Sequence, residues 1–192
     1  MAATKAQLEI TEVFAKYKAA LLQGNGEVAW SVLDSHTTNF YVQVIRDSHS
    51  LPEGDFDRLD WIQKFTVARF RLEFRKADLV KLSGKDAFVL GVTNGWISKS
   101  TVEGMKAFDR IAVGGRYATA FLPEAPTIPA FHFIQEGTEW EFALWRSFAL
   151  MNKSMEQMKK ESGLSEREFI VQMLQQISKY KVDERIFSGP LD

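Results

Sequence analysis

The spacing of apolar residues changes near Met105, and this change constrains the fold more than any other feature of the sequence. Before it, apolar side chains recur every three or four residues, as at Ile10 and Phe14, which is the period of an amphipathic helix. After it, alternating apolar and polar residues predict strands. Helical spacing returns around Phe169 and Met173. The order predicts an α+β fold in which N-terminal helices pack on a curved antiparallel sheet, with extra C-terminal helices.

Several predicted helices carry a start signal. Asp60 with Gln63, and Ser165 with Glu168, have the spacing of capping boxes, so a helix is expected after each pair. Residues 86–96 fit either a helix or one arm of a hairpin, and a helix is favoured. The predicted helices cover about residues 4–23, 26–33, 40–47, 61–74, 76–82, 86–96, 155–162 and 166–177.

A hairpin is the clearest β-structure in the sequence. Residues 130–135 and 139–150 flank a Glu-Gly-Thr turn, which predicts two antiparallel strands. Two more strands are predicted within Arg110–Phe121, on either side of a Gly-Gly pair. If Phe133 lies opposite Phe142, the hairpin has two largely apolar faces. The face under the helices is then expected to carry Phe131, Phe133, Trp140, Phe142 and Leu144, and the other face Ala130, His132, Ala143, Trp145 and Ser147.

The composition excludes several kinds of chemistry. The 192 residues contain no cysteine, so disulfides, thiolate metal sites and thiol nucleophiles are excluded. The net charge of -1 does not suit a general nucleic-acid binder, and no apolar run is long enough for a membrane span. Lys5, Glu9 and Glu12 occupy the stretch that a signal peptide keeps apolar, which predicts a cytoplasmic protein. Zinc-binding histidine spacing, phosphate loops and nucleophile elbows do not occur, so neither metal nor cofactor is predicted.

Basic residues gather between residues 64 and 76. Phenylalanines lie among them, as on some surfaces that bind single-stranded nucleic acid. On a helix, however, these charges point in many directions, which favours a solvated face and predicts no nucleic-acid partner. The basic cluster comprises Lys64, Arg69, Arg71, Arg75 and Lys76.

Short stretches of the chain resemble a known fold. Together with the order of predicted elements, they are similar to the nuclear transport factor 2-like superfamily, whose helices pack on a curved sheet to form a cone. The stretches are Leu22–Glu27, Val113–Ala118 and Phe133–Phe142, and a likeness to an uncharacterised bacterial branch is carried by Leu82–Asp86, Asn94–Ile97 and Ile186–Leu191.

The resemblance implies a cone-shaped domain over residues 1–150 and a helical extension over residues 151–192 packed on the same domain. The superfamily hosts isomerases, dehydratases, cyclases and non-catalytic modules, so the fold alone selects no function. We expect a non-catalytic homodimer whose pocket binds a small apolar or acidic ligand. Two alternatives stay open: an isomerase, dehydratase or cyclase that uses the same pocket, and a protein-interaction scaffold whose cone is filled. The isomerase catalytic positions have no match here, so catalytic residues stay unassigned.

Two arginines interrupt apolar strand patterns. By strand parity, Arg146 follows the face under the helices, so its guanidinium group can reach the cone mouth and hold a carboxylate or phosphate. The alternative is an arginine at a strand end that pairs with a nearby acid. The predicted ligand-binding residues are Tyr41, Trp96, Arg116, Trp140 and Arg146, and the predicted dimer interface includes His132 and Trp145.

Overall fold

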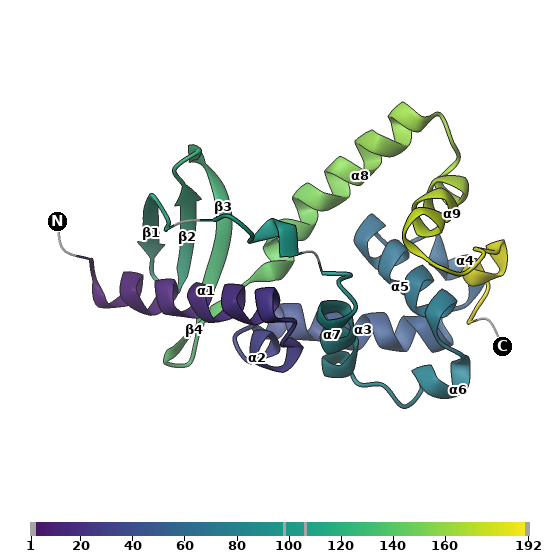
Figure 1. The fold of residues 1–192 in the computed structure, drawn as a ribbon, viewed down its shortest axis with the longest axis horizontal. Helices are drawn as coiled ribbons and strands as arrows, with labels where there is room; N and C mark the ends of the chain where they lie inside the picture. The colour runs from purple at the N-terminus through teal and green to yellow at the C-terminus, as the bar shows by residue number, and fades with distance from the viewer. Residues whose placement is uncertain (1–2, 98, 106, 191–192) are drawn as a thin grey trace. The chain divides into compact units, whose positions relative to one another are not determined.

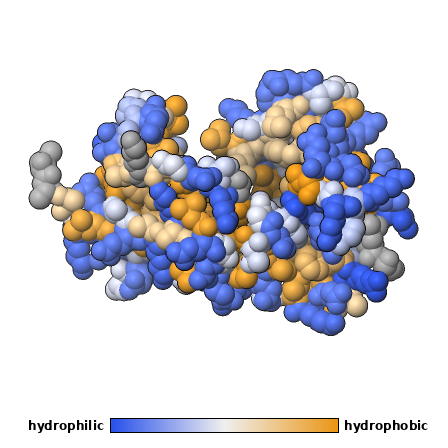
Figure 2. All heavy atoms as spheres, in the orientation of Figure 1, coloured by the Kyte–Doolittle hydropathy of each residue, from blue (hydrophilic) through white to orange (hydrophobic). Residues whose placement is uncertain are grey.

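The computed structural model describes residues 3–97, 99–105 and 107–190, and it confirms the α+β class (Figure 1). The described part contains helices and one four-stranded antiparallel sheet in the order β1-β2-β3-β4. No helix within it is long and apolar enough to cross a membrane. Figure 2 shows apolar side chains in patches among hydrophilic ones on the visible face.

The chain forms two compact units. Unit 1 comprises Met1–Tyr41 with Lys85–Ser147, and unit 2 comprises Val42–Gly84 with Phe148–Asp192. These bounds differ from the expected division at residue 150, and the cone-shaped domain stays a prediction.

The sheet and its neighbouring helices belong to unit 1. The strands are β1 (Arg110–Gly114), β2 (Tyr117–Leu122), β3 (Ala125–Glu136) and β4 (Glu139–Phe142). The helices are α1 (Lys5–Gln23), α2 (Gly26–Trp30) and the short 3₁₀ helices η1 (Lys99–Thr101) and η2 (Leu144–Ser147). The division between the units falls inside α3 (Ser35–Ser50) and after the first residue of α7 (Gly84–Thr93). Unit 2 contains α4 (Glu53–Phe56), α5 (Trp61–Glu73), α6 (Lys76–Leu79), α8 (Phe148–Ser162), α9 (Glu166–Ile177) and η3 (Glu184–Phe187).

Local capping signals place helix starts where the sequence predicts them. The Thr4 hydroxyl accepts the backbone N–H of Gln7 at 3.3 Å, and the Gln7 side chain accepts the N–H of Thr4 at 2.9 Å. Gly24 ends α1 with a φ of 70°, a conformation that glycine adopts without steric cost. The capping boxes at Asp60 and Ser165 start α5 and α9. The helical interpretation of residues near α7 is confirmed as well.

The predicted register of the hairpin is confirmed. Phe133 lies opposite Phe142 in the ladder of β3 and β4, and opposite Ala118 in the ladder of β2 and β3. We call the face that carries Phe133 and packs against α1 the inner face, and the opposite face the outer face. Tyr117 and Ile134, opposite each other in neighbouring strands, lie on the outer face.

The strand predicted over residues 139–150 is wrong beyond Phe142, where the chain turns into η2 and then α8. Trp145 directs this departure from the ladder. Its backbone N–H donates to the Thr37 hydroxyl at 3.1 Å, and its indole N–H donates to the Asp34 carboxylate at 2.8 Å. Both acceptors come from a distant part of the sequence, so strand alternation could not indicate where β4 ends.

Aromatic side chains fill the space between α1 and the inner face. The ring of Phe14 on α1 lies 4.6 Å from the ring of Phe131 and 4.7 Å from that of Phe108, measured between centroids. Tyr17 lies 4.6 Å from Phe142 in the same way. Ring pairs at these separations are typical of a packed core.

The basic cluster is not a uniformly solvated face, because α8 and η3 pack against α5. Arg71 is completely buried, and all five N–H donors of its guanidinium group are used. Lys64 is also buried, with its Nζ 2.5 Å from Glu166. The prediction is wrong for these two residues, whereas Arg75 and Lys76 are exposed. The five acceptors of Arg71 are the carbonyl oxygens of Asp47 (3.1 Å), Ser48 (3.0 Å), Leu51 (2.6 Å), Ile186 (3.1 Å) and Phe187 (3.0 Å).

Candidate functional site

Two of the predicted ligand-binding residues lie in the interior. The Tyr41 ring is 5.2 Å from that of Phe88 and 6.4 Å from that of Trp30, and burial raises the pKa of Tyr41 above its ordinary value. Trp140 on β4 is 5% exposed. Both rings therefore serve the core of unit 1. Trp96 follows α7 and is half-buried.

The other predicted residues meet on the outer face, around Tyr117 of β2. The guanidinium carbon of Arg116, in the β1–β2 turn, is 5.5 Å from the centre of the Tyr117 ring. Arg146 on η2 lies 5.4 Å from the same ring and 4.8 Å from the ring of Trp145. His132 lies on the same face, and burial, followed by the charge of Arg146, lowers its pKa. The structure thus brings Arg116, Arg146, His132 and Trp145 together.

Arg146 reaches the outer face, so the face that strand parity assigns to it is wrong, whereas its place at a cone mouth stays a prediction. Strand parity does not apply to it, because η2 is helical and lies along β3. His36, near the start of α3, extends the group by stacking on Trp145 with 5.1 Å between ring centroids and 25° between planes. We call this set the arginine–aromatic row; it comprises Arg116, Tyr117, Arg146, Trp145 and His36.

The arginine–aromatic row contains two positively charged groups, the guanidinium groups of Arg116 and Arg146. Other arginines of the described residues do form ion pairs with carboxylates, among them Arg46, Arg58, Arg167 and Arg185. Neither Arg116 nor Arg146 has a carboxylate partner in the part of the chain that the structure describes, and both side chains are exposed. Contact with an aromatic ring fixes a guanidinium plane while its N–H edge stays open to hydrogen bonds. That edge matches the oxygens of a carboxylate or phosphate.

A group of carboxylates, the acidic cluster, lies beside the row and comprises Asp34, Glu136 and Glu141. Asp34 directly precedes α3, is completely buried, and accepts the indole N–H of Trp145 at 2.8 Å. Glu136 at the end of β3 accepts the backbone N–H of Ser35 at 3.2 Å and its hydroxyl at 2.7 Å. The cluster therefore joins the start of α3 to the β3–β4 hairpin.

Glu141 is the member of the acidic cluster whose pKa is raised. Its Oε2 atom is buried and has no hydrogen-bond partner among the described residues. Burial comes first among the causes that raise the pKa of Glu141 to about 7, followed by the charge of Glu136, a hydrogen bond between the two carboxyl groups, and the charges of Asp34 and Glu139. Burial also acts to raise the pKa of Glu136, but hydrogen bonds from Ser35 outweigh it and hold that pKa below its ordinary value.

The acidic cluster concentrates negative charge in one part of unit 1. Asp34, Glu136 and His36 each offer a ligand atom, and these atoms lie within 4.8 Å of one another. Among the described residues, His36 is the basic side chain within ion-pair distance of the cluster, with its Nδ1 3.7 Å from Asp34. Carboxylates in such a setting attract either a proton or a cation.

The ligand-binding residues predicted from the sequence do not include Tyr117, His36 or the acidic cluster. Tyr117 had a local signal, because it directly follows Arg116. The cluster had none, since Asp34 is 111 positions from Trp145 along the chain. The contacts that define it exist only after β3 and β4 have paired beside α3.

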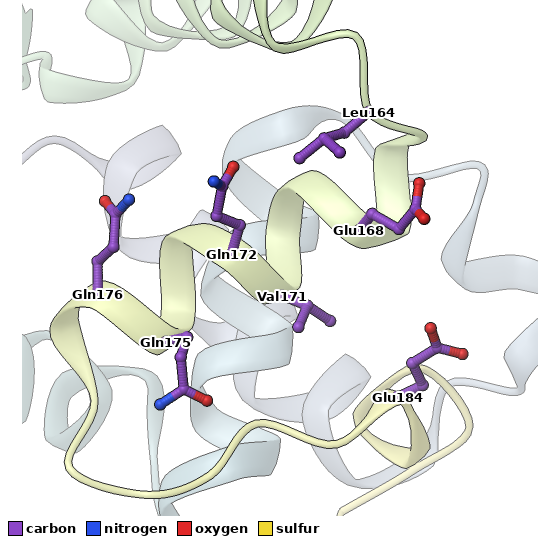
Figure 3. Close-up of a pocket in the computed structure, with 7 residues that line it drawn as sticks. All are labelled: Leu164, Glu168, Val171, Gln172, Gln175, Gln176 and Glu184. Atoms are coloured by element: carbon purple, nitrogen blue, oxygen red, sulfur yellow. The ribbon is translucent and has the colours of Figure 1, made fainter.

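A separate open groove runs along α9 in unit 2 (Figure 3). Its volume is about 460 Å³, and none of the predicted site residues lines it. Several of its polar groups already have partners: Gln175 bonds to Tyr180 and Val182, and Glu168 accepts from Ser165. The lining residues are Leu164, Glu168, Val171, Gln172, Gln175, Gln176 and Glu184.

The candidate site of unit 1 thus consists of a pair of arginines on aromatic rings and a neighbouring set of carboxylates. Comparison of the chain with protein-family models, with curated proteins and with solved structures gave no match. Its function therefore has to be argued from the chemistry of this site.

Proposed function

We propose that unit 1 is a non-catalytic module that binds a small anionic ligand on its outer face, through Arg116 and Arg146. One observation carries the proposal: both guanidinium groups contact the ring of Tyr117, and neither has a carboxylate partner within the described ranges. Ordering two exposed arginine side chains costs conformational entropy. A shared anionic ligand offsets that cost, because it bonds to both groups at once.

The chemistry of the row favours binding over acid–base catalysis. Arginine stays protonated throughout the physiological pH range, so Arg116 and Arg146 supply positive charge and take no part in proton transfer. Each can form a bidentate pair with a carboxylate or phosphate. Tyr117 is 47% exposed, so its ring offers apolar surface to the body of the ligand.

The proposal puts the ligand outside the cone that the family resemblance implies. The aromatic packing of Phe14, Phe108 and Phe131 against the inner face supports this choice, because a ligand there would have to displace core side chains. The outer face needs no such displacement.

Isothermal titration calorimetry with phosphate, succinate and glutarate tests the proposal. Losing one charge-assisted pair costs about 1.5–3 kcal/mol, so Arg116→Gln and Arg146→Gln should each weaken binding at least about tenfold. Arg110→Gln is the matched control, because Arg110 lies on the same sheet, 3.8 Å from the Phe121 ring. The proposal is wrong if no anion binds at millimolar concentration, or if the control variant loses as much affinity.

Homodimerisation through the outer face is a second candidate, favoured by the opposite charges there. In a two-fold pairing, the arginines of one copy can meet the carboxylates of the other in both directions. The predicted interface residues His132 and Trp145 lie on this surface and are half-buried. Light scattering should then give a dimer mass at low salt and a monomer mass for Arg146→Glu. A monomer mass at every salt concentration would exclude this pairing.

A further inference from the structure

The contacts of the arginine–aromatic row alternate between guanidinium groups and rings. Arg116 lies 5.5 Å from the centre of the Tyr117 ring, and Arg146 lies 5.4 Å from the same centre. Arg146 also lies 4.8 Å from the ring of Trp145, on which the ring of His36 stacks. The members of the row are therefore planar groups in successive contact, and they come from the β1–β2 hairpin, from η2 and from α3.

The row leaves surface for a further planar group. Tyr117 is 47% exposed, and the side chains of Arg116 and Arg146 are exposed as well. A guanidinium group has two flat faces, and only one of them can contact the ring of Tyr117. The ring of a ligand can therefore stack on the exposed part of Tyr117 or on the outward face of a guanidinium group.

The exposure of the row favours a flat ligand over a bulky one. An aliphatic body gains affinity mainly when most of its surface is removed from water, as in a deep pocket. A flat ring makes its full contact through one face, and positive charge beside that face adds electrostatic attraction. Exposed aromatic and arginine side chains hold planar bases in this way in proteins that bind single-stranded nucleic acids.

The two guanidinium groups indicate that the ligand also carries negative charge. Their carbon atoms lie no further apart than the sum of their distances to the centre of the Tyr117 ring. A carboxylate or phosphate attached to an aromatic ring can therefore pair with the N–H edge of one guanidinium group while its ring reaches the other. Positive charge already acts on this face, because the pKa of His132 is lowered by burial and then by Arg146.

We infer that the ligand of this site is a planar aromatic anion, an aryl carboxylate or aryl phosphate, whose charged group pairs with Arg116 or Arg146 and whose ring stacks on the row. The inference rests on the proposed function, and it names the chemical class of the ligand. An aliphatic anion would use the guanidinium edges and leave the ring of Tyr117 uncovered.

The test compares ligands of equal charge that differ in the flatness of their rings. Benzoate and cyclohexanecarboxylate have the same number of carbon atoms, and only benzoate is aromatic; phenyl phosphate and cyclohexyl phosphate form the corresponding pair. All four are titrated into the full chain by calorimetry. In the pair that binds, the aromatic member should bind at least about fivefold more tightly, which corresponds to about 1 kcal/mol. Naphthoate, with a larger flat surface, should bind more tightly than benzoate.

Variants test whether Tyr117 provides the stacking surface. Tyr117→Leu should bring the ratio of the aromatic to the aliphatic affinity close to one, because leucine is apolar but has no ring. Tyr117→Phe restores the ring and should restore the preference. Tyr180→Leu is the matched control, because Tyr180 is 44% exposed and lies 5.1 Å from the Lys179 ammonium group, but belongs to unit 2. Circular dichroism verifies that each variant is folded.

The outcomes separate the two proposals. If the aromatic and aliphatic members of each pair bind the natural chain equally, the aromatic ligand is overturned and anion binding stands; this comparison needs no variant. If the aromatic preference persists in Tyr117→Leu, or is lost equally in Tyr180→Leu, the row is not the stacking surface and the inference is again overturned. If no anion binds at millimolar concentration, both proposals are wrong.

Discussion

Replacing Arg71 with methionine would test how much the most fully bonded side chain of unit 2 contributes to its stability. The substitution keeps an unbranched chain of similar length and removes the guanidinium group with its five hydrogen bonds. The acceptors lie in or just after α3 and in η3. Both segments therefore lose the partner that they share.

The magnitude follows from the carbonyl oxygens left behind. A buried polar group that loses its partner costs about 1–3 kcal/mol. Asp47 is less affected, because its carbonyl oxygen also accepts the N–H of Leu51 at 3.1 Å. Part of the loss is regained, since burial disfavours the charge of Arg71 and lowers its pKa to about 10. The expected net decrease in the free energy of unfolding is about 3–5 kcal/mol.

Urea titration followed by circular dichroism measures this decrease. Arg75→Met is the matched control, because Arg75 lies four positions further along and is exposed; it should change the unfolding free energy by less than about 0.5 kcal/mol. Amide exchange at Ile186 and Phe187 should accelerate in the Arg71 variant only. A decrease below about 1 kcal/mol, or an equal one in the control, would refute the proposed contribution of these hydrogen bonds.

Three further predictions concern unit 1. Gly26→Ala should lower the free energy of unfolding by about 1–3 kcal/mol despite the better helix propensity of alanine. The reason is that the new Cβ would lie 2.6 Å from the Cα of Val89. Gly54→Ala is the control, because open space surrounds Gly54, and it should not lower the melting temperature. Trp140→Ala should cost about 3–5 kcal/mol in urea titration, and a loss under about 1 kcal/mol would remove this ring from the core. Glu141, with its pKa raised from 4.5 to about 7, holds a proton in the folded state that the unfolded chain releases, so stability should fall as pH rises between these values. Glu141→Gln should flatten this decline and be more stable than the natural chain at pH about 8 but not at about 5; an unchanged slope would contradict the assignment.

The elements that could be predicted from the sequence are those specified by their own residues. Thr4, Asp60 and Ser165 each satisfy the first backbone N–H groups of a helix from within four positions, so the signal is complete in a short window. The pairing of Phe133 with Phe142 is likewise set by a short turn and by alternation.

The end of β4 and the burial of Arg71 could not be predicted in this way. Trp145 leaves the ladder because of acceptors on Asp34 and Thr37, more than a hundred positions earlier. Arg71 is buried because backbone carbonyls from two distant segments surround it, and any residue type can supply a carbonyl. No pattern of residue types in the sequence therefore predicts such a contact.

The candidate site was predictable only in part. Arg116 and Arg146 stand out in the sequence because a charge interrupts apolar stretches. Their face could not be assigned, since Arg146 lies on a helical turn that alternation does not describe. The carboxylates that accompany them, Glu136 and Glu141, resemble ordinary strand-end acids until Asp34 is packed beside them.

The hydrogen bonds of Arg71 also constrain the order in which unit 2 can fold during translation. Ile186 and Phe187 follow Arg71 by 115 and 116 positions. A ribosome that adds about 5–20 residues per second needs roughly 6–23 s to reach them. During that interval the first half of unit 2 lacks two hydrogen-bond acceptors of Arg71, the carbonyl oxygens of Ile186 and Phe187. Unit 2 therefore stays incomplete for several seconds after its first half has been synthesised.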